Sequence, residues 1–161
     1  MPCDYPTLLC YILLERKYKA VPLGMEIRKL EKNDPEGINL FRSFPFRLYA
    51  KNKFWVPPFP GEIERVMSTS DHPYYEHSDA DFFIVCQEGL VVGRIAVLHN
   101  RLYCDYHQVN SGFFYYFDSV DDPEVASLLF STAEEWCRKK GLESLIGPKG
   151  FIRSNGAGVL V

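Results

Sequence analysis

The sequence lacks the features that usually tie a protein to a membrane or to nucleic acid. Its apolar run from Leu8 to Leu14 is too short to span a bilayer, and it follows Asp4 rather than the basic residues of a secretion signal. Positive charge is not in excess, because the formal net charge of the 161 residues is −3 at pH 7. That balance gives no general attraction to nucleic acid or to an anionic membrane, so we expect neither as a partner.

Paired cysteines and familiar catalytic or metal motifs are missing as well. The five cysteines are odd in number and scattered through predicted strands and a helix, which favours free thiols and predicts a reducing cytoplasm. There is no Ser-His-Asp order, P-loop or dinucleotide fingerprint. His72 and His77 are not spaced as a helical ligand pair, and Cys104 with His107 is half of a zinc set. We therefore expect no metal site.

Apolar and aromatic residues are plentiful. They make up 47% and 15% of the chain, which predicts one compact domain at this length. Residues 1–24 differ in pattern from the rest, and Met25–Leu30 reads as the first strand. We therefore expect an N-terminal extension of uncertain structure over 1–24 and a domain over 25–161, so that removing the extension changes stability little. A short helix packed on the core is the alternative for the extension.

Short helices are predicted after the first strand. Asp34-Pro35-Glu36 is a helix-start signal, and we expect the helix to be interrupted at Pro45, with a second turn or helix over residues 46–49. The proline-rich segment Trp55–Pro60 predicts an extended loop. Gly61–Met67 has apolar residues at helical spacing and predicts another short helix.

A strand meander follows. Phe82–Gln87 and Val91–Leu98 are apolar runs joined by Glu88-Gly89, and this turn is typical of an antiparallel hairpin. A polar stretch over 99–110 then leads to Gly112–Phe117, a continuous aromatic run typical of a central strand covered on both faces. The three strands together predict an antiparallel meander.

The stretch from Ser111 to Pro148 organises the rest of the chain. After the aromatic strand, Asp121 and Glu124 form a capping-box pattern, Pro123 fits the first helical position, and apolar residues continue at helical spacing to position 137. A short apolar strand over 142–146 follows, and a crossover helix between two strands indicates that they are parallel. Ligands of such units lie at the carboxyl ends of the strands, beside the helix N-terminus.

Several motifs lie on these elements: Phe44-Pro-Phe-Arg-Leu-Tyr49, Trp55-Val-Pro-Pro58, Gly93-Arg-Ile95, the aromatic run at Gly112, Asp122-Pro-Glu-Val-Ala126 and Gly147-Pro148. From about Met25 to the C-terminus, these motifs and the order of the elements resemble the GNAT superfamily of N-acyltransferases, in particular a bacterial GNAT-like branch. The resemblance implies an α/β fold whose mixed sheet has an antiparallel meander, a crossover helix and a parallel fifth strand. It also implies a further helix and two strands beyond Val161, so we expect the C-terminal part of the fold to be absent.

The resemblance implies transfer of an acyl group from acyl-coenzyme A to an amine. Acetyl-CoA or another acyl-CoA would lie between the diverging fourth and fifth strands, with its pantetheine arm along the aromatic strand and its pyrophosphate on the following turn. The acceptor would be a small-molecule or protein amine, and no catalytic residue is assigned. Lys149 and Arg153 could supply the phosphate donors. The strand and turn residues placed on the coenzyme are Tyr115, Tyr116, Phe117, Asp118, Ser119 and Val120.

The turn after the aromatic strand departs from the family pattern. It has no glycine to let backbone N–H groups approach a pyrophosphate, and it carries acids that would repel one, while Asp121 or Asp122 fits a simple helix cap. Tyr115 and Tyr116 should point to opposite faces of the strand, and both also fit a role in the core. The alternative function is therefore a noncatalytic ligand-binding or protein-interaction module with a degenerate coenzyme site.

An exposed sheet edge is a further expectation. If the elements that cover the fifth strand are absent, its outer edge is left without a partner, and the apolar residues 158–161 could pair with such an edge. We therefore expect a homo-oligomer that forms through this edge.

Overall fold

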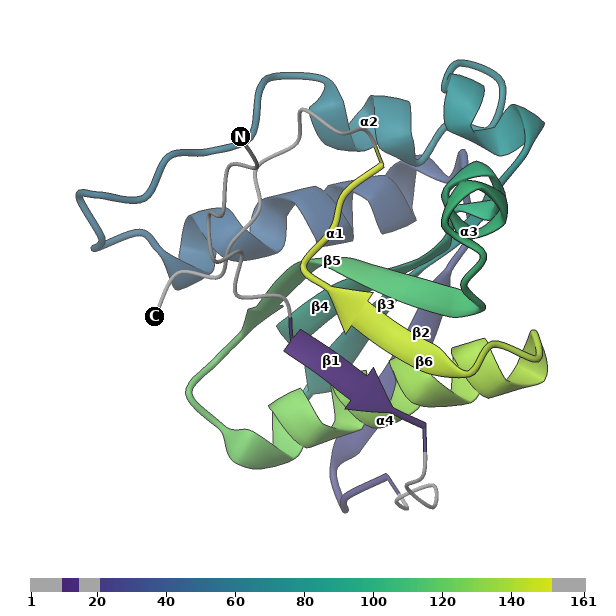
Figure 1. Ribbon diagram of the computed structural model, residues 1–161. Helices are drawn as coiled ribbons and strands as arrows, with labels where there is room; N and C mark the ends of the chain where they lie inside the picture. The colour runs from purple at the N-terminus through teal and green to yellow at the C-terminus, as the bar shows by residue number, and fades with distance from the viewer. Residues whose placement is uncertain (1–9, 15–20, 152–161) are drawn as a thin grey trace.

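The computed structural model describes residues 10–14 and 21–151. They form a six-stranded mixed sheet in the order β1-β6-β5-β4-β3-β2, with helices on both faces (Figure 1). The strands are β1 (Cys10–Leu13), β2 (Met25–Leu30), β3 (Asp79–Gln87), β4 (Leu90–His99), β5 (Ser111–Ser119) and β6 (Ser144–Gly147). The helices are α1 (Pro35–Leu48), α2 (Glu62–Val66), α3 (Arg101–His107) and α4 (Pro123–Lys139), and a 3-10 turn, η1, covers Pro73–Glu76.

The predicted α/β architecture is confirmed. Strands β2, β3, β4 and β5 pair antiparallel in sequence order, and β5 pairs parallel with β6 after the crossover helix α4. At the predicted hairpin, Glu88 and Gly89 both have positive φ, 51° and 79°, which matches the right-handed twist of the paired strands. The polar stretch before β5, for which the sequence analysis predicts no helix, contains α3, which Asn100 caps by accepting a hydrogen bond from the Tyr103 N–H.

The two faces of the sheet carry separate cores. One face packs against α4, and its core includes Val85, Ile95 and Phe114; the other packs against α1 and α2. Helix α4 lies very close to β5, because a Cβ added at Gly112 would sit 2.3 Å from the Sγ of Cys137. Only glycine leaves room for that approach, so Gly112 at the start of the aromatic run allows α4 to pack closely on β5.

Helix α1 is continuous, and the expected interruption at Pro45 is wrong. A proline inside a helix leaves the carbonyl four residues earlier without its N–H donor. Here that carbonyl belongs to Phe41, and it accepts a hydrogen bond of 2.6 Å from the Nη1 of Arg94 on β4. A side chain from the sheet therefore replaces the missing backbone donor, and the helix runs on through the proline.

The first strand of the sheet lies within the expected extension. Cys10–Leu13 forms β1, which pairs antiparallel with β6 from Cys10 opposite Gly147 to Leu13 opposite Ser144. Met25–Leu30 is a strand as predicted, but it is the second in the chain. The outer edge of β6, which the sequence predicted to be open, is thus paired with β1. The prediction of an oligomer that forms through this edge is therefore no longer supported. The apolar residues 158–161 lie outside the described residues.

Removing residues 1–24 is consequently expected to destabilise the protein, contrary to the estimate from the sequence. A chain beginning at Met25 loses the backbone partner of β6, and we expect a loss of about 1–2 kcal/mol, equivalent to roughly 2–8 °C in melting temperature. The newly open edge should also promote association. Thermal melts and light scattering of the two chains measure both effects, and an unchanged melt with no added association would show that β1 contributes nothing.

Candidate functional site

Strands β5 and β6 separate soon after they pair. Their register runs only from Ser111 opposite Ser144 to Phe113 opposite Ile146, although β5 continues to Ser119. After β6 the chain passes over β5 toward α2 (Figure 1). In that passage the N–H of Lys149 donates to the Phe114 carbonyl at 2.8 Å. β6 therefore ends while β5 continues, and the chain after β6 leaves the sheet, so the two strands part toward their carboxyl ends as the sequence resemblance implied.

A β-bulge in the pairing with β4 reshapes β5 just beyond its last pairing with β6. Tyr115 pairs with Ala96 and Asp118 pairs with Arg94, so two residues of β5 lie opposite the single residue between Arg94 and Ala96. Tyr116, inside the bulge, has a φ of 49°. A bulge breaks the alternation of side chains along a strand. Tyr115 and Tyr116 accordingly lie on the same face, with ring centroids 4.5 Å apart, and the expectation of opposite faces is wrong.

Glu62, which no sequence motif marks, contacts this pair of tyrosines. It is the first residue of α2, and its Oε1 accepts a hydrogen bond of 2.6 Å from the Tyr116 hydroxyl. Burial, together with the hydrogen bond and charge of Glu62, raises the pKa of Tyr116 far above its ordinary value. Burial and the Glu62 charge also raise the pKa of Tyr115. A carboxylate and two neutral phenols are thus gathered beside the bulge.

Asp118 belongs to a buried ion pair and cannot contact a ligand freely. Its Oδ2 accepts a hydrogen bond of 2.7 Å from the Nε of Arg94, and its Oδ1 accepts one of 2.8 Å from the Tyr49 hydroxyl. The Arg94 side chain is 3% exposed and that of Asp118 is 15% exposed. Burial and the hydrogen bond to Asp118 raise the pKa of Tyr49 to about 12, so this phenol remains a donor at neutral pH. The charge of Asp118 is therefore neutralised within the fold.

The remaining polar groups of the turn after β5 are largely engaged with one another. The N–H of Val120 donates to the Val92 carbonyl and that of Asp122 to the Val120 carbonyl, at 2.9 and 2.7 Å. Ser119 donates its hydroxyl to the same Val120 carbonyl. The N-cap of α4 is Asp122 rather than Asp121, and it accepts a hydrogen bond from the Glu124 N–H. With these donors used and no glycine present, the turn does not fit the pyrophosphate of coenzyme A.

The other predicted ligands are divided between different places. Phe117 turns to the α4 face, where its ring lies 4.7 Å from that of Phe130. The Lys149 ammonium lies over the rings of Tyr103 and Phe113, 2.8 and 4.7 Å from their centroids, near the amino end of β5 and away from the turn. Arg153 lies outside the described residues. The structure therefore brings Tyr115 and Tyr116 together but does not bring Lys149 to the turn.

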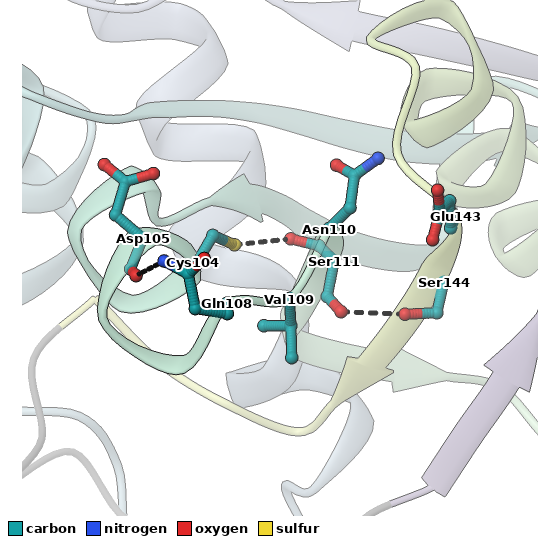
Figure 2. A pocket seen from close by; sticks show the side chains of 8 residues that line it. All are labelled: Cys104, Asp105, Gln108, Val109, Asn110, Ser111, Glu143 and Ser144. Atoms are coloured by element: carbon teal, nitrogen blue, oxygen red, sulfur yellow. Dashed lines mark hydrogen bonds between the residues drawn. The ribbon is translucent and has the colours of Figure 1, made fainter.

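A hollow of about 610 Å³ lies at the opposite end of β5 and β6 (Figure 2). It lies between the end of α3 and the starts of the two parallel strands. Within it, the Cys104 thiol donates to the Ser111 carbonyl at 3.2 Å, and the Ser111 and Ser144 hydroxyls are 2.8 Å apart. Ligands of parallel βαβ units lie at the carboxyl ends of strands. The hollow is at the amino ends, so the diverging strands remain the better candidate site.

Metal chemistry has no obvious position in the part of the chain that the structure describes. Among residues 10–14 and 21–151, no three side chains of His, Cys, Asp or Glu gather closely enough to hold an ion. His72 is buried and accepts a hydrogen bond at its Nδ1 from the Tyr74 N–H. This histidine is therefore engaged as a cap of the short η1 turn.

Two curated proteins are similar in sequence to this chain over most of its length. The chain is 30% identical over 132 residues to Protein YghO of Escherichia coli (strain K12), an alignment that covers 82% of this chain and 33% of that protein. It is 29% identical over 128 residues to a bacterial ceramide synthase of Caulobacter vibrioides, covering 79% of this chain and 33% of the relative. The chain thus spans about a third of the length of these relatives. No family model matches the sequence.

Solved structures share the fold. A tandem GNAT protein from the clavulanic acid biosynthesis pathway superposes with a TM-score of 0.60 at 16% identity, over 75% of this chain and 35% of that one. The chain has a GNAT-like fold. An aminoglycoside acetyltransferase from an uncultured soil metagenomic sample matches with a TM-score of 0.51 at 18% identity, over 76% and 75% of the two chains. An acetyltransferase from Streptococcus agalactiae matches with the same score and identity, over 76% and 71%.

The GNAT-like fold identifies the two strands between which the sequence resemblance placed the coenzyme. Its fourth and fifth strands are β5 and β6 here, because β1 comes before the strand that was expected to be the first. The candidate site of this GNAT-like fold is therefore the divergence of β5 from β6, with Tyr115, Tyr116 and Glu62 on one side.

Proposed function

We propose that this chain is part of an N-acyltransferase that forms an amide between an acyl group and a primary amine. The observation that carries the proposal is the divergence of β5 from β6 at a bulge whose tyrosine contacts a carboxylate. The GNAT-like fold supports acyl transfer as the reaction class. The name of the Caulobacter relative supports a long-chain amine as acceptor, because a ceramide is an amide of a long-chain amino alcohol. A protein amine is the second candidate acceptor.

We propose Glu62 as the group that receives a proton in this reaction. In amide formation the amine nitrogen attacks the acyl carbon, the bond to the leaving group breaks, and the attacking nitrogen loses a proton. Glu62 lies 2.6 Å from the Tyr116 hydroxyl, which orients its carboxylate beside the bulge. Tyr116 stays protonated because its pKa is raised by burial and by Glu62, so it acts as a fixed donor to that carboxylate.

We propose that the protein binds the acyl donor through its acyl-pantetheine part and not through its phosphates. Acetyl-CoA or another acyl-CoA is the candidate donor that the fold suggests, but in the turn after β5 the Val120 and Asp122 N–H groups are engaged and Asp118 is paired with Arg94. The same observation favours the second candidate function, a noncatalytic GNAT-like module that binds a ligand or a protein partner without the coenzyme.

A comparison of donors tests this proposal. We expect an acyl-pantetheine and the matching acyl-CoA to bind with dissociation constants within about threefold of each other, because the Val120 and Asp122 N–H groups are already engaged and the turn has no glycine. Titration calorimetry measures both constants, and a thermal melt verifies the fold. An acyl-CoA that binds more than about 100-fold tighter would show that the turn does accept the diphosphate. A folded chain that binds neither donor would favour the noncatalytic module.

A further inference from the structure

The loop between α1 and α2 projects from the molecule and exposes large apolar side chains. It forms the leftmost projection of the ribbon in Figure 1. Phe54, Val56 and Phe59, here called the apolar tip, are 78%, 81% and 84% exposed. Single exposed apolar residues are common on protein surfaces, but three within one short projecting segment are unusual and mark an interaction surface.

The base of this loop is firmly anchored, which keeps the tip turned outward. The Trp55 ring stacks on that of Tyr49 with centroids 5.4 Å apart and meets the edge of Phe46 at 5.1 Å. The Asn52 side chain accepts a hydrogen bond of 3.0 Å from the Phe54 N–H. Three prolines, at positions 57, 58 and 60, restrict the backbone beyond it. The tip is therefore presented on an ordered support and does not fold back on the core.

The charge around the tip is opposite to that of the chain as a whole. From position 37 to position 61 there is no Asp or Glu, while the same segment contains four basic residues. Two of them are occupied at the base, since Arg42 pairs with Glu64 at 2.6 Å and Arg47 donates to the carbonyl of Val91. The other two, Lys51 and Lys53, are exposed beside the tip, and the Lys53 ammonium lies 5.2 Å from the centre of the Phe54 ring.

We propose that residues 51–60 form a membrane-docking loop that inserts its apolar tip into the interface of an anionic lipid bilayer. Aromatic side chains are favoured at the level of the headgroups, and neighbouring lysines gain by approaching anionic lipids. Both kinds of group occur together here, on a projecting loop whose local charge is positive. The net charge of −3 predicted no attraction to a membrane, but that value is a sum over the whole chain and does not reflect the positive charge of this segment.

The docking loop would act as a peripheral contact. Within residues 10–14 and 21–151, no helix has the length and apolar character needed to cross a bilayer. The loop is nevertheless linked to the candidate site, because Trp55 stacks on Tyr49 and the Tyr49 hydroxyl donates to Asp118 at the end of β5. Docking would therefore bring the α1 and α2 side of the sheet near the lipid surface. The inference stands on the loop alone and does not require that the chain catalyse acyl transfer.

Vesicle binding by the 161-residue chain tests the proposal. Sedimentation with vesicles of phosphatidylcholine, with and without 30% phosphatidylglycerol, is expected to show stronger binding to the anionic mixture. The double variant Phe54→Ser/Phe59→Ser should lose at least about tenfold in partition coefficient through the lost apolar contact. Lys51→Ala/Lys53→Ala should lose about 25-fold on the anionic vesicles, roughly fivefold per lysine. Raising the salt concentration should weaken binding of the wild-type chain.

The matched control changes exposed apolar residues elsewhere. Leu102 and Tyr106 on α3 are 57% and 83% exposed, and Leu102→Ser/Tyr106→Ser should bind vesicles within twofold of wild type. The serine and alanine variants alter exposed side chains, whereas Trp55→Phe alters a half-buried one, and thermal melts verify that each is folded. Brominated lipids should quench Trp55 fluorescence in the wild type, and Trp55→Phe should remove that quenching.

Three results would overturn the proposal. The first is a folded chain that does not sediment with anionic vesicles. The second is binding that the α3 variant weakens as much as the Phe54→Ser/Phe59→Ser variant does. The third is self-association in the absence of lipid that Phe54→Ser/Phe59→Ser abolishes, without any vesicle binding by the wild type, since the tip would then be a contact between two copies of the chain.

Discussion

Arg94→Met is expected to lower the free energy of unfolding by about 3–5 kcal/mol, which is the usual effect of removing one partner from a buried ion pair. The substitution keeps most of the apolar volume but removes the guanidinium. Asp118 is then left largely buried with only the Tyr49 hydroxyl, and the Phe41 carbonyl loses its donor. Urea denaturation of the wild type and the variant measures the difference.

A second variant and a surface control separate the buried pair from charge removal in general. Adding Asp118→Asn to Arg94→Met should recover part of the loss, because the uncompensated charge is gone. Arg101 pairs with Asp79 at 2.7 Å, with side chains 56% and 37% exposed. Arg101→Met should therefore cost less than about 1 kcal/mol. If Arg94→Met costs no more than this control, the Arg94 network does not stabilise the fold.

Glu62→Gln is expected to reduce the rate of acyl transfer by about 10²–10⁴-fold if Glu62 receives the proton from the amine. Glutamine keeps a hydrogen-bond acceptor for Tyr116 but cannot be protonated, so the affinity for the acyl donor should change little. The rate is measured with an acyl-pantetheine donor and a long-chain primary amine. Because the pKa of Tyr116 is raised, this phenol stays neutral, and the pH profile between about 6 and 9 should show no loss from its ionisation.

The control for Glu62 lies on the same short helix. Glu64 pairs with Arg42 at 2.6 Å and makes no hydrogen bond to Tyr116. Glu64→Gln should leave the rate within about twofold of wild type, since the Glu64 carboxylate pairs with Arg42 on α1 and the Tyr116 hydroxyl donates to Glu62. Equal rates for Glu62→Gln and the wild type would remove Glu62 from the chemistry, whereas a loss in both variants would indicate that α2 as a whole had shifted.

Features set by local patterns were predictable from the sequence. The aromatic strand, the hairpin at Glu88-Gly89 and the helix that begins at Pro123 each depend on neighbours within a few residues, and all three form near the expected positions. Helix α3 is not predicted by the pattern of apolar residues, because its composition is polar and aromatic with a weak apolar stripe. Its cap at Asn100 was the one local signal that could have revealed it.

Features set by distant contacts were not predictable in this way. The bulge at Tyr116 places two consecutive tyrosines on one face, and β1 joins a strand more than a hundred residues away in the chain. Glu62 carries no motif that marks it, because its importance comes from its contact with Tyr116. The end of α1 could not be predicted from Pro45 for the same reason, since the donor to the Phe41 carbonyl comes from Arg94 on strand β4.

The proline inside α1 also constrains how this sequence can change over time. Pro45 and Arg94 both affect the carbonyl oxygen of Phe41. Pro45 has no N–H to donate to it, and Arg94 donates in its place. A lineage that replaced the proline by an ordinary residue would restore the helical donor and set two donors in competition. One that lost the arginine first would leave the helix with an orphaned acceptor. The two positions should therefore vary together among relatives, although one lies on a helix and the other on a strand 49 positions along the sequence.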